Sequence, residues 1–265
     1  KRVFCVFESI CSYGRVYING TLAGQHKGGR TTFPVDITDH VHFGGDNVIA
    51  VKVWLPDIND HPFDIPWIDP VLQNAKVGSD KLGHGAHPLG MARPAHVLIT
   101  DPVRVEHFGT YVWCDSGKVS SSSAEANVRT EVVNYRNERV AVTVKSEILD
   151  AAGTVLAITQ STQDVGAGQV VKCEQKGITV SNPHLWSLDD CYLHRLKTTL
   201  LVDGGVVDTC LTTFGFRWIR WPRHRWNHPL QSGSGDPFFT LNGKQTLING
   251  ANIWETQLGT SFALC

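Results

Sequence analysis

Hydrophobic and polar residues alternate along much of the chain, which is the pattern of β-strands that bury one face. The alternation is clearest at Val128, Thr130 and Val132, and it returns in residues 140–148, with turn-forming residues 135–138 in between. A period of two residues indicates antiparallel strands with one face on a core and the other in solvent. The pattern therefore predicts an all-β protein.

Other segments fit the same interpretation. Residues 3–7 form a short continuous apolar run, as expected for a strand buried on both faces. Asn19-Gly20 and Asp203-Gly204-Gly205 are hairpin turn sequences, because these residue types tolerate positive φ. Further strands are expected at residues 14–18, 47–54, 95–99, 154–159, 170–173, 194–202 and 206–214, and residues 103–113 are expected to form a strand pair or one long bent strand. No amphipathic helix of useful length is expected before residue 250.

The predicted strands fall into two groups, one before residue 102 that is interrupted by a long loop and one from Val103 onwards. Residues 55–94 are rich in Pro, Gly, Asp and His without a sustained period, and a loop of that length is usually functional. From Val103 onwards, about seven short strands at regular spacing predict an immunoglobulin-like β-sandwich over residues 103–216. After Phe216 the composition changes to a segment dense in Arg, Trp, His and Pro, followed by a short hairpin with its turn at residues 242–244.

Composition narrows the function classes. A formal net charge of −1 and a pI near 6.9 give no global attraction to nucleic acid or to an anionic membrane. No apolar run approaches the roughly 18 residues of a membrane span. Neither a phosphate-binding glycine loop nor the G-x-S-x-G elbow of a nucleophilic serine is present. No cofactor is expected. Cys5, Cys173 and Cys210 are interpreted as small buried hydrophobes, and the seven scattered cysteines do not settle the compartment.

Four stretches of the chain carry recognisable motifs in a fixed order. They are residues 7–53 (with FESI, GRVYING, GQHKGG, FPVDIT and GDNVIAVKV), 88–94 (PLGMARP), 182–187 (NPHLWS) with 214–217 (FGFR), and 239–244 (FTLNGK) with 249–252 (NGAN). Together they resemble glycoside hydrolase family 2, the group that contains β-galactosidases, β-glucuronidases and β-mannosidases. Each motif alone is weakly specific. Their order and spacing over nearly the whole chain carry the resemblance.

The resemblance implies a domain plan. Residues 1–102 would be a jelly-roll domain of the sugar-binding type whose first strands lie upstream of Lys1, and residues 103–216 the immunoglobulin-like sandwich. Residues 217–265 would be a linker and the first edge of a (β/α)8 catalytic barrel. Such a barrel needs about 250 residues. The family's two catalytic glutamates, about 5 Å apart in a retaining enzyme, would lie on later barrel strands, so no catalytic residue is expected here.

The resemblance also nominates substrate contacts. Family members commonly read G-x-N-x-H-E at the first barrel strand, and here the stretch contains Asn252 and Glu255, with Trp254 in place of the histidine. That departure puts the common galactosidase and glucuronidase specificities in doubt. These residues either touch the sugar in the intact enzyme or pack the barrel floor.

Two further stretches carry candidate chemistry. His84 and His87 lie in the long loop before the PLGMARP motif, where they could contact sugar, contribute to a metal site or simply be solvated. Residues 217–226 interleave arginines with tryptophans. This run is interpreted as an interdomain strap, with its Trp side chains packed on the barrel and its Arg side chains paired with carboxylates. Nucleic-acid binding and sugar binding are the less favoured alternatives.

Three functions compete on this basis. The first is the non-catalytic part of a retaining exo-β-glycosidase that hydrolyses O-glycosidic bonds in carbohydrate catabolism. The second is a carbohydrate-binding module, and the third is a structural immunoglobulin-like adhesion protein. The barrel-entry motif at residues 239–252 favours the first. The expected partner is a carbohydrate substrate of the full-length enzyme, with no nucleic acid, membrane or metal, and with a homo-oligomer left open.

Overall fold

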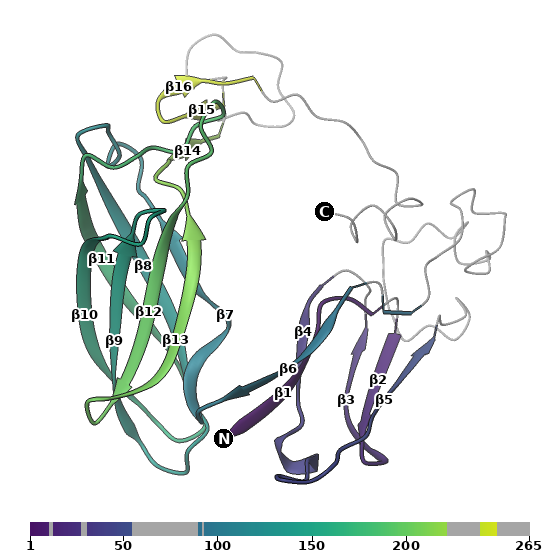
Figure 1. The fold of residues 1–265 in the computed structure, drawn as a ribbon. Helices are drawn as coiled ribbons and strands as arrows, with labels where there is room; N and C mark the ends of the chain where they lie inside the picture. Colours follow the sequence, from purple (N-terminus) through teal and green to yellow (C-terminus); the bar gives the residue numbers. More distant parts are fainter. Residues whose placement is uncertain (11–12, 28–30, 55–89, 92, 222–238, 248–265) are drawn as a thin grey trace, which may run out of the picture. The chain divides into compact units, whose positions relative to one another are not determined.

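The structure is a computed structural model that describes residues 1–10, 13–27, 31–54, 90–91, 93–221 and 239–247. The chain divides into two compact units, unit 1 with the described residues up to Thr100 and unit 2 beginning at Asp101 (Figure 1). Within the described residues, regular structure consists of strands and one short 3-10 helix, η1 (Thr38–His40). None of the described helical structure has the length and apolar character needed to cross a membrane. The all-β prediction is confirmed.

Unit 1 contains two three-stranded antiparallel sheets. One has the order β4 (Phe33–Asp36), β1 (Arg2–Phe7), β6 (Ala95–Thr100), and the other has the order β3 (Thr21–Lys27), β2 (Tyr13–Ile18), β5 (Ile49–Trp54) (Figure 1). Their shared core includes Val3 and Phe7 from β1, Val16 and Ile18 from β2, and Val35 from β4.

The turn between β2 and β3 uses the predicted residue pair. Asn19 and Gly20 have φ of 50° and 84°, the left-handed region in which these two residue types are least strained. This turn sets the register in which Ile18 pairs with Thr21.

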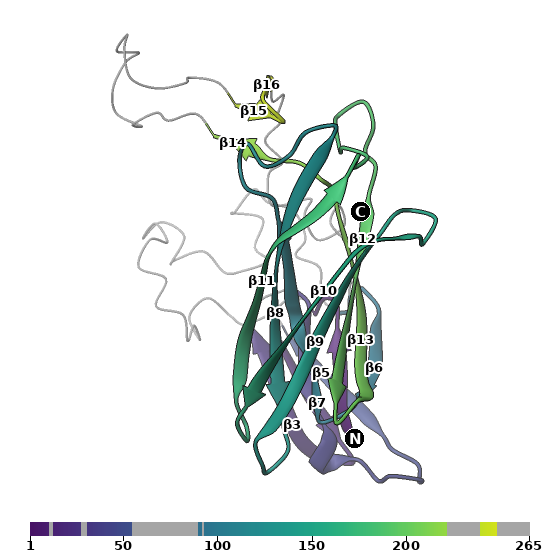
Figure 2. The same cartoon turned by 90° about the vertical axis from the view of Figure 1, so that its left-hand side faces the viewer.

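Unit 2 is a two-layer β-sandwich of long antiparallel strands. Its four-stranded sheet has the order β10 (Val155–Val165), β9 (Val140–Leu149), β12 (His194–Val202), β13 (Gly205–Phe214). Its three-stranded sheet has the order β11 (Val170–Ser181), β8 (Ser123–Asn134), β7 (Val103–Trp113). Figure 2 shows the strands of both layers running along the length of the unit.

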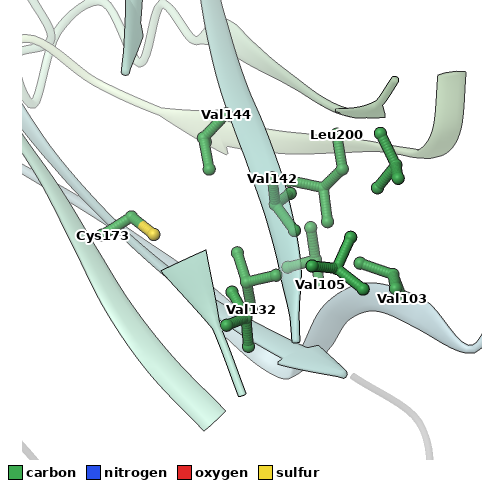
Figure 3. Packing of buried hydrophobic residues seen from close by; sticks show 10 residues of the cluster. Val103, Val105, Val132, Val142, Val144, Cys173 and Leu200 are labelled. Atoms are coloured by element: carbon green, nitrogen blue, oxygen red, sulfur yellow. The ribbon is translucent and has the colours of Figure 1, made fainter. Parts of the chain in front are cut away.

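The core of unit 2 consists of two separate hydrophobic clusters. One contains valines from both sheets with Cys173 and Leu200 (Figure 3), and the other is built around Ile148, Leu196 and Phe216. Each fully buried side chain of the size of leucine stabilises the folded state by about 1.5–3 kcal/mol. These clusters therefore hold the two sheets together.

Several strands differ from the sequence-based expectation. The strands predicted at 154–159 and 170–173 continue to Val165 and Ser181. The sequence pattern does not reveal these ends, because polar residues occupy the solvent-facing positions there and obscure the alternation. Residues 103–113 form one bent strand, which is one of the two arrangements predicted for them, and its register shifts between Val105 and Thr110. At this bulge Phe108 has φ of 57° and is 77% exposed.

The five described cysteines are free thiols. Cys5 and Cys173 are buried, as predicted, whereas Cys210 is only partly buried because β13 is the edge strand of its sheet. Burial raises the pKa of all three thiols, which makes the reactive thiolate scarce at neutral pH.

A small third sheet follows the sandwich in unit 2. Strands β14 (Ile219–Arg220), β15 (Thr240–Leu241) and β16 (Lys244–Gln245) pair antiparallel in this order. The turn between the last two strands is Asn242-Gly243, with φ of 49° and 79°. This hairpin falls at the predicted position of residues 242–244.

Candidate functional site

The sequence-predicted substrate contacts lie outside the described residues. This applies to Asn252, Trp254 and Glu255 in the NGAN-containing stretch and to His84 and His87 in the long loop. The described residues that lead towards the first group are those of the hairpin at 239–247. The way this hairpin is attached to the sandwich is therefore the part of the candidate site that can be built from coordinates.

Asn242 is the centre of that attachment. Its Nδ2 donates a hydrogen bond to the main-chain oxygen of Trp186 at 2.9 Å, and its Oδ1 accepts one from the Trp218 N–H at 2.9 Å. Its own N–H donates to the Trp218 oxygen at 3.0 Å. The positive φ of Asn242 lets one residue make the hairpin turn and present its side chain to both tryptophan backbones. We call this contact the Trp186–Asn242 junction.

Trp186 is held on the sandwich side of the junction by close packing. Its N–H donates to the Phe216 oxygen at 3.1 Å, and the Arg217 guanidinium lies over its ring at 4.3 Å from the centroid. Gly215 passes so close that a Cβ built there would be 2.6 Å from the Cβ of Trp186. Only glycine permits this approach, so the FGFR and NPHLWS motifs meet at one point.

The arginine and tryptophan run is described only as far as Trp221. Arg217 stacks on the Trp186 ring, a cation–π contact, rather than forming the expected pair with a carboxylate in the described structure. Trp218 contacts the Asn242-Gly243 turn, whereas Trp221 is 67% exposed and meets the Phe239 ring edge to face at 5.1 Å. Residues 222–226 of the run lie outside the described part.

A histidine cluster braces the loop that carries Trp186. Nε2 of His184 lies 2.5 Å from Oδ2 of Asp190, and the His184 ring stacks on Tyr192 at 3.9 Å. Tyr192 in turn meets the buried ring of His194 at 4.9 Å. Burial and the nearby His184 hold the pKa of His194 below its ordinary value of 6.5, although Asp150 acts in the opposite direction.

The described carboxylates that are tied into hydrogen-bonded ion pairs suit a structural role. Hydrogen bonds and charge from Lys145 and Lys197 lower the pKa of Glu147, with nitrogen–oxygen distances of 3.0 and 3.4 Å. Burial would raise the pKa of Asp36, but hydrogen bonds from Thr38 and Arg2 outweigh it and lower it. A general acid of a glycosidase needs a raised pKa, so neither group is suited to that role.

Across the described ranges, no group of three or more His, Cys, Asp or Glu side chains is placed to hold a metal ion. The His184–Asp190 pair alone offers two ligands, fewer than the usual four of a structural zinc site.

Sequence reasoning found both halves of the junction but not their contact. The NPHLWS and FTLNGK motifs are separated by more than fifty residues, and no local pattern indicates that Asn242 reaches Trp186. The available signal is Asn-Gly at the turn, since Asn tolerates the left-handed conformation and its side chain can hydrogen-bond to backbone groups.

Comparisons with known proteins agree with this architecture. Residues 106–217, nearly the whole sandwich of unit 2, match the family model for glycosyl hydrolases family 2. The chain is 30% identical to a β-glucuronidase of Formosa agariphila, covering 96% of this chain and 25% of that protein. It is also 30% identical to the β-galactosidase BoGH2A of Bacteroides ovatus, covering 92% of this chain and 24% of that protein.

A solved structure gives the same result. The structure of a β-glucuronidase from glycoside hydrolase family 2 superimposes with a TM-score of 0.71 at 28% identity, covering 92% of this chain and 24% of that one. The chain thus spans about a quarter of the length of the relatives it matches. Sequence motifs, all-β architecture and these similarities agree, and they assign residues 106–217, the region that the family model matches, to glycoside hydrolase family 2.

Proposed function

We propose that this chain is the non-catalytic sandwich region of a retaining exo-β-glycosidase that acts in carbohydrate catabolism. In this proposal unit 1 is part of a jelly-roll domain of the sugar-binding type, and unit 2 from residue 103 to residue 216 is an immunoglobulin-like domain. Residues 217–265 lead into the first edge of a (β/α)8 catalytic barrel. The acid/base and nucleophile glutamates belong to barrel strands outside this chain.

The observation that supports the proposal most strongly is the Trp186–Asn242 junction. The region matching the family ends at residue 217, and the hairpin that follows is tied back to the sandwich through Asn242. A rigid attachment at this point would fix where the following chain leaves the sandwich. Precise placement of groups around a substrate is worth several orders of magnitude in rate, so a non-catalytic sandwich can still matter for catalysis.

The substrate contacts in the whole enzyme are part of the same proposal. Asn252 and Glu255 would face the sugar with Trp254 beside them, and His84 and His87 would reach the pocket from the long loop. The names of the relatives support a β-galactoside or β-glucuronide as the substrate class. Trp254, which stands where a histidine is common, makes a different β-glycoside the main alternative.

One observation favours the second candidate, a carbohydrate-binding module. Trp221 is 67% exposed beside Phe239, and aromatic side chains offer an apolar face with a polar edge to a ligand. Calorimetric titration with methyl β-galactoside, β-glucuronide and β-mannoside separates the two functions. Under the main proposal no saturable binding is expected. Saturable binding that Trp221→Ala abolishes, and that Tyr111→Ala on β7 leaves intact, would favour the module.

A further inference from the structure

One complete layer across the interior of unit 2 contains no aliphatic side chain. On the four-stranded sheet, Ser146 pairs with Thr159 on one side and Thr198 on the other, and Thr198 pairs with Cys210. On the three-stranded sheet, Thr130 pairs with Thr110 and Cys173. The layer is thus hydroxyl or thiol on every strand, and we call it the polar layer.

The polar layer lies between the two hydrophobic clusters of the core. In the next inward-facing positions along the strands, Val144 and Leu200 belong to one cluster, and Ile148 and Leu196 belong to the other. Figure 3 shows Cys173, a buried member of both the polar layer and a hydrophobic cluster, beside the valines of that cluster. The separation of the core into two clusters follows from this layer.

Both edges of the layer are bridged between the sheets by polar contacts. At the β7 and β13 edge, the Thr110 hydroxyl lies 3.7 Å from the Cys210 sulfur. At the β10 and β11 edge, Gln175 crosses the sandwich, and its Nε2 donates to the Val144 oxygen at 2.9 Å and to the Ser161 hydroxyl at 3.2 Å.

Between these edges, polar atoms are buried without a protein partner. Ser146 Oγ, Thr130 Oγ1 and Thr198 Oγ1 belong to side chains with 0% exposure, and they make no hydrogen bond of normal geometry. Gln175 Oε1 is also buried and without a hydrogen-bond partner. The Cys210 thiol beside Thr198 is at best a weak partner, as sulfur generally is.

Buried hydroxyls and amides in folded proteins are nearly always hydrogen-bonded, to protein or to internal water. An internal water typically makes about three hydrogen bonds to polar groups that would otherwise be unpaired. The four unpartnered oxygens come from strands β8, β9, β11 and β12, which are drawn from both sheets. We propose that the polar layer is an internal hydration site, in which ordered water bridges the two sheets of unit 2.

Isosteric substitution distinguishes a hydrated layer from a dry one by the sign of its effect. In a dry layer each hydroxyl loses its hydrogen bonds to water on folding and gains no partner, which destabilises the folded chain. Thr130→Val, Thr198→Val or Ser146→Ala would then raise the midpoint of thermal unfolding. In a hydrated layer each single change deprives the bridging water of a partner. We expect each of the three variants to lower the midpoint of the 265-residue chain by about 3–6 °C.

The triple variant tests whether the effects of the three substitutions on the midpoint are additive. Replacing both partners of a hydrogen bond by apolar groups of similar shape can be nearly neutral. Ser146→Ala/Thr130→Val/Thr198→Val removes three of the four proposed partners of the water, so it should lower the midpoint by less than the sum of the three single changes. The matched control is Thr209→Val on β13, whose side chain is exposed and which should stay within about 1 °C of the parent chain. A rise of the midpoint in the single variants would overturn the proposal.

A direct observation keeps the proposal testable if a variant does not fold. A high-resolution crystal structure of the unmodified chain should show ordered density within hydrogen-bonding distance of Ser146 Oγ and of at least one of Thr130 Oγ1, Thr198 Oγ1 and Gln175 Oε1. A layer empty of density, with these oxygens still unpaired, would contradict it. Direct hydrogen bonds among the side chains themselves, formed by different rotamers, would contradict it as well.

Discussion

The side-chain amide of Asn242 donates a hydrogen bond to the main-chain oxygen of Trp186 at 2.9 Å, across a sequence separation of 56 residues. A single turn residue thereby ties the hairpin at 239–247 to a loop of the sandwich. The contact is local to unit 2 and depends on one side chain in one backbone conformation. Neither Asn242 nor Trp186 belongs to a hydrophobic cluster of unit 2.

Asn242→Ala should release the hairpin from the sandwich. The substitution removes two side-chain hydrogen bonds and places alanine at a φ of 49°. The cost should be about 1–3 kcal/mol in the free energy of local opening, seen as faster amide exchange in residues 240–246. Asn137→Ala, in the exposed turn before β9, is the matched control and should leave exchange there unchanged. Equal exchange in both variants would show that Asn242 does not secure the hairpin.

Gly215→Ala should destabilise the junction from the other side. The added methyl would lie 2.6 Å from the Cβ of Trp186, and such overpacking costs about 1–3 kcal/mol in the free energy of unfolding. The control is Gly205→Ala, where the same methyl would lie at an ordinary 3.5 Å from the Val202 oxygen. Urea titration of each variant, of Trp186→Gly and of the corresponding double mutants measures the coupling, since only glycine at position 186 removes the Cβ that the new methyl would meet. Strictly additive effects would mean that contact with Trp186 is not the cause.

His194 should make the stability of unit 2 fall on mild acidification. Burial lowers its pKa in the folded chain below the ordinary 6.5, so the unfolded chain binds a proton first as the pH falls. Stability is therefore full above about pH 7 and declines below 6.5 until the lowered pKa is reached, by at most about 1.4 kcal/mol per pH unit. The depressed pKa of Glu147 acts only at lower pH, below its ordinary 4.5.

The measurement is the free energy of unfolding by urea at several pH values from 7.5 to about 5.5, a window chosen to isolate the histidine term. In His194→Gln the decline should flatten. In His42→Gln, which alters an exposed histidine of unit 1, it should persist. The same slope in the parent chain and in His194→Gln would assign the decline to another group.

Much of the fold could be predicted where local chemistry and tertiary structure agree. The strand at residues 194–202 was predicted with the bounds that β12 has, and the Asn19-Gly20 turn adopts the positive φ values that its residue types favour. The ends of β10 and β11 were missed, since their outer residues are polar and mask the alternation. The bulge at Phe108 has no local signal, because an exposed aromatic residue with positive φ contradicts its own propensity.

The interior posed a different difficulty. The alternation placed Thr130 with Val128 and Val132, and Ser146 with Val144 and Ile148, on shared faces, which the burial of these residues confirms. It could not show that Ser146 and Thr198 pair directly and meet another polar row across the core, because that depends on the pairing of distant strands. The substrate contacts proposed at Asn252, Trp254, Glu255, His84 and His87 stay predictions, since they fall outside the described residues.

The most direct test of the central claim is hydrolysis of chromogenic aryl β-galactoside, β-glucuronide and β-mannoside by the purified 265-residue chain. No turnover above the buffer blank is expected, since the proposed domain plan assigns the acid and the nucleophile of the retaining mechanism to barrel strands outside this chain. The control is a complete family 2 enzyme prepared identically, which must be active on its own substrate. Turnover that follows the 265-residue chain through successive purification steps would contradict the claim that this region is non-catalytic.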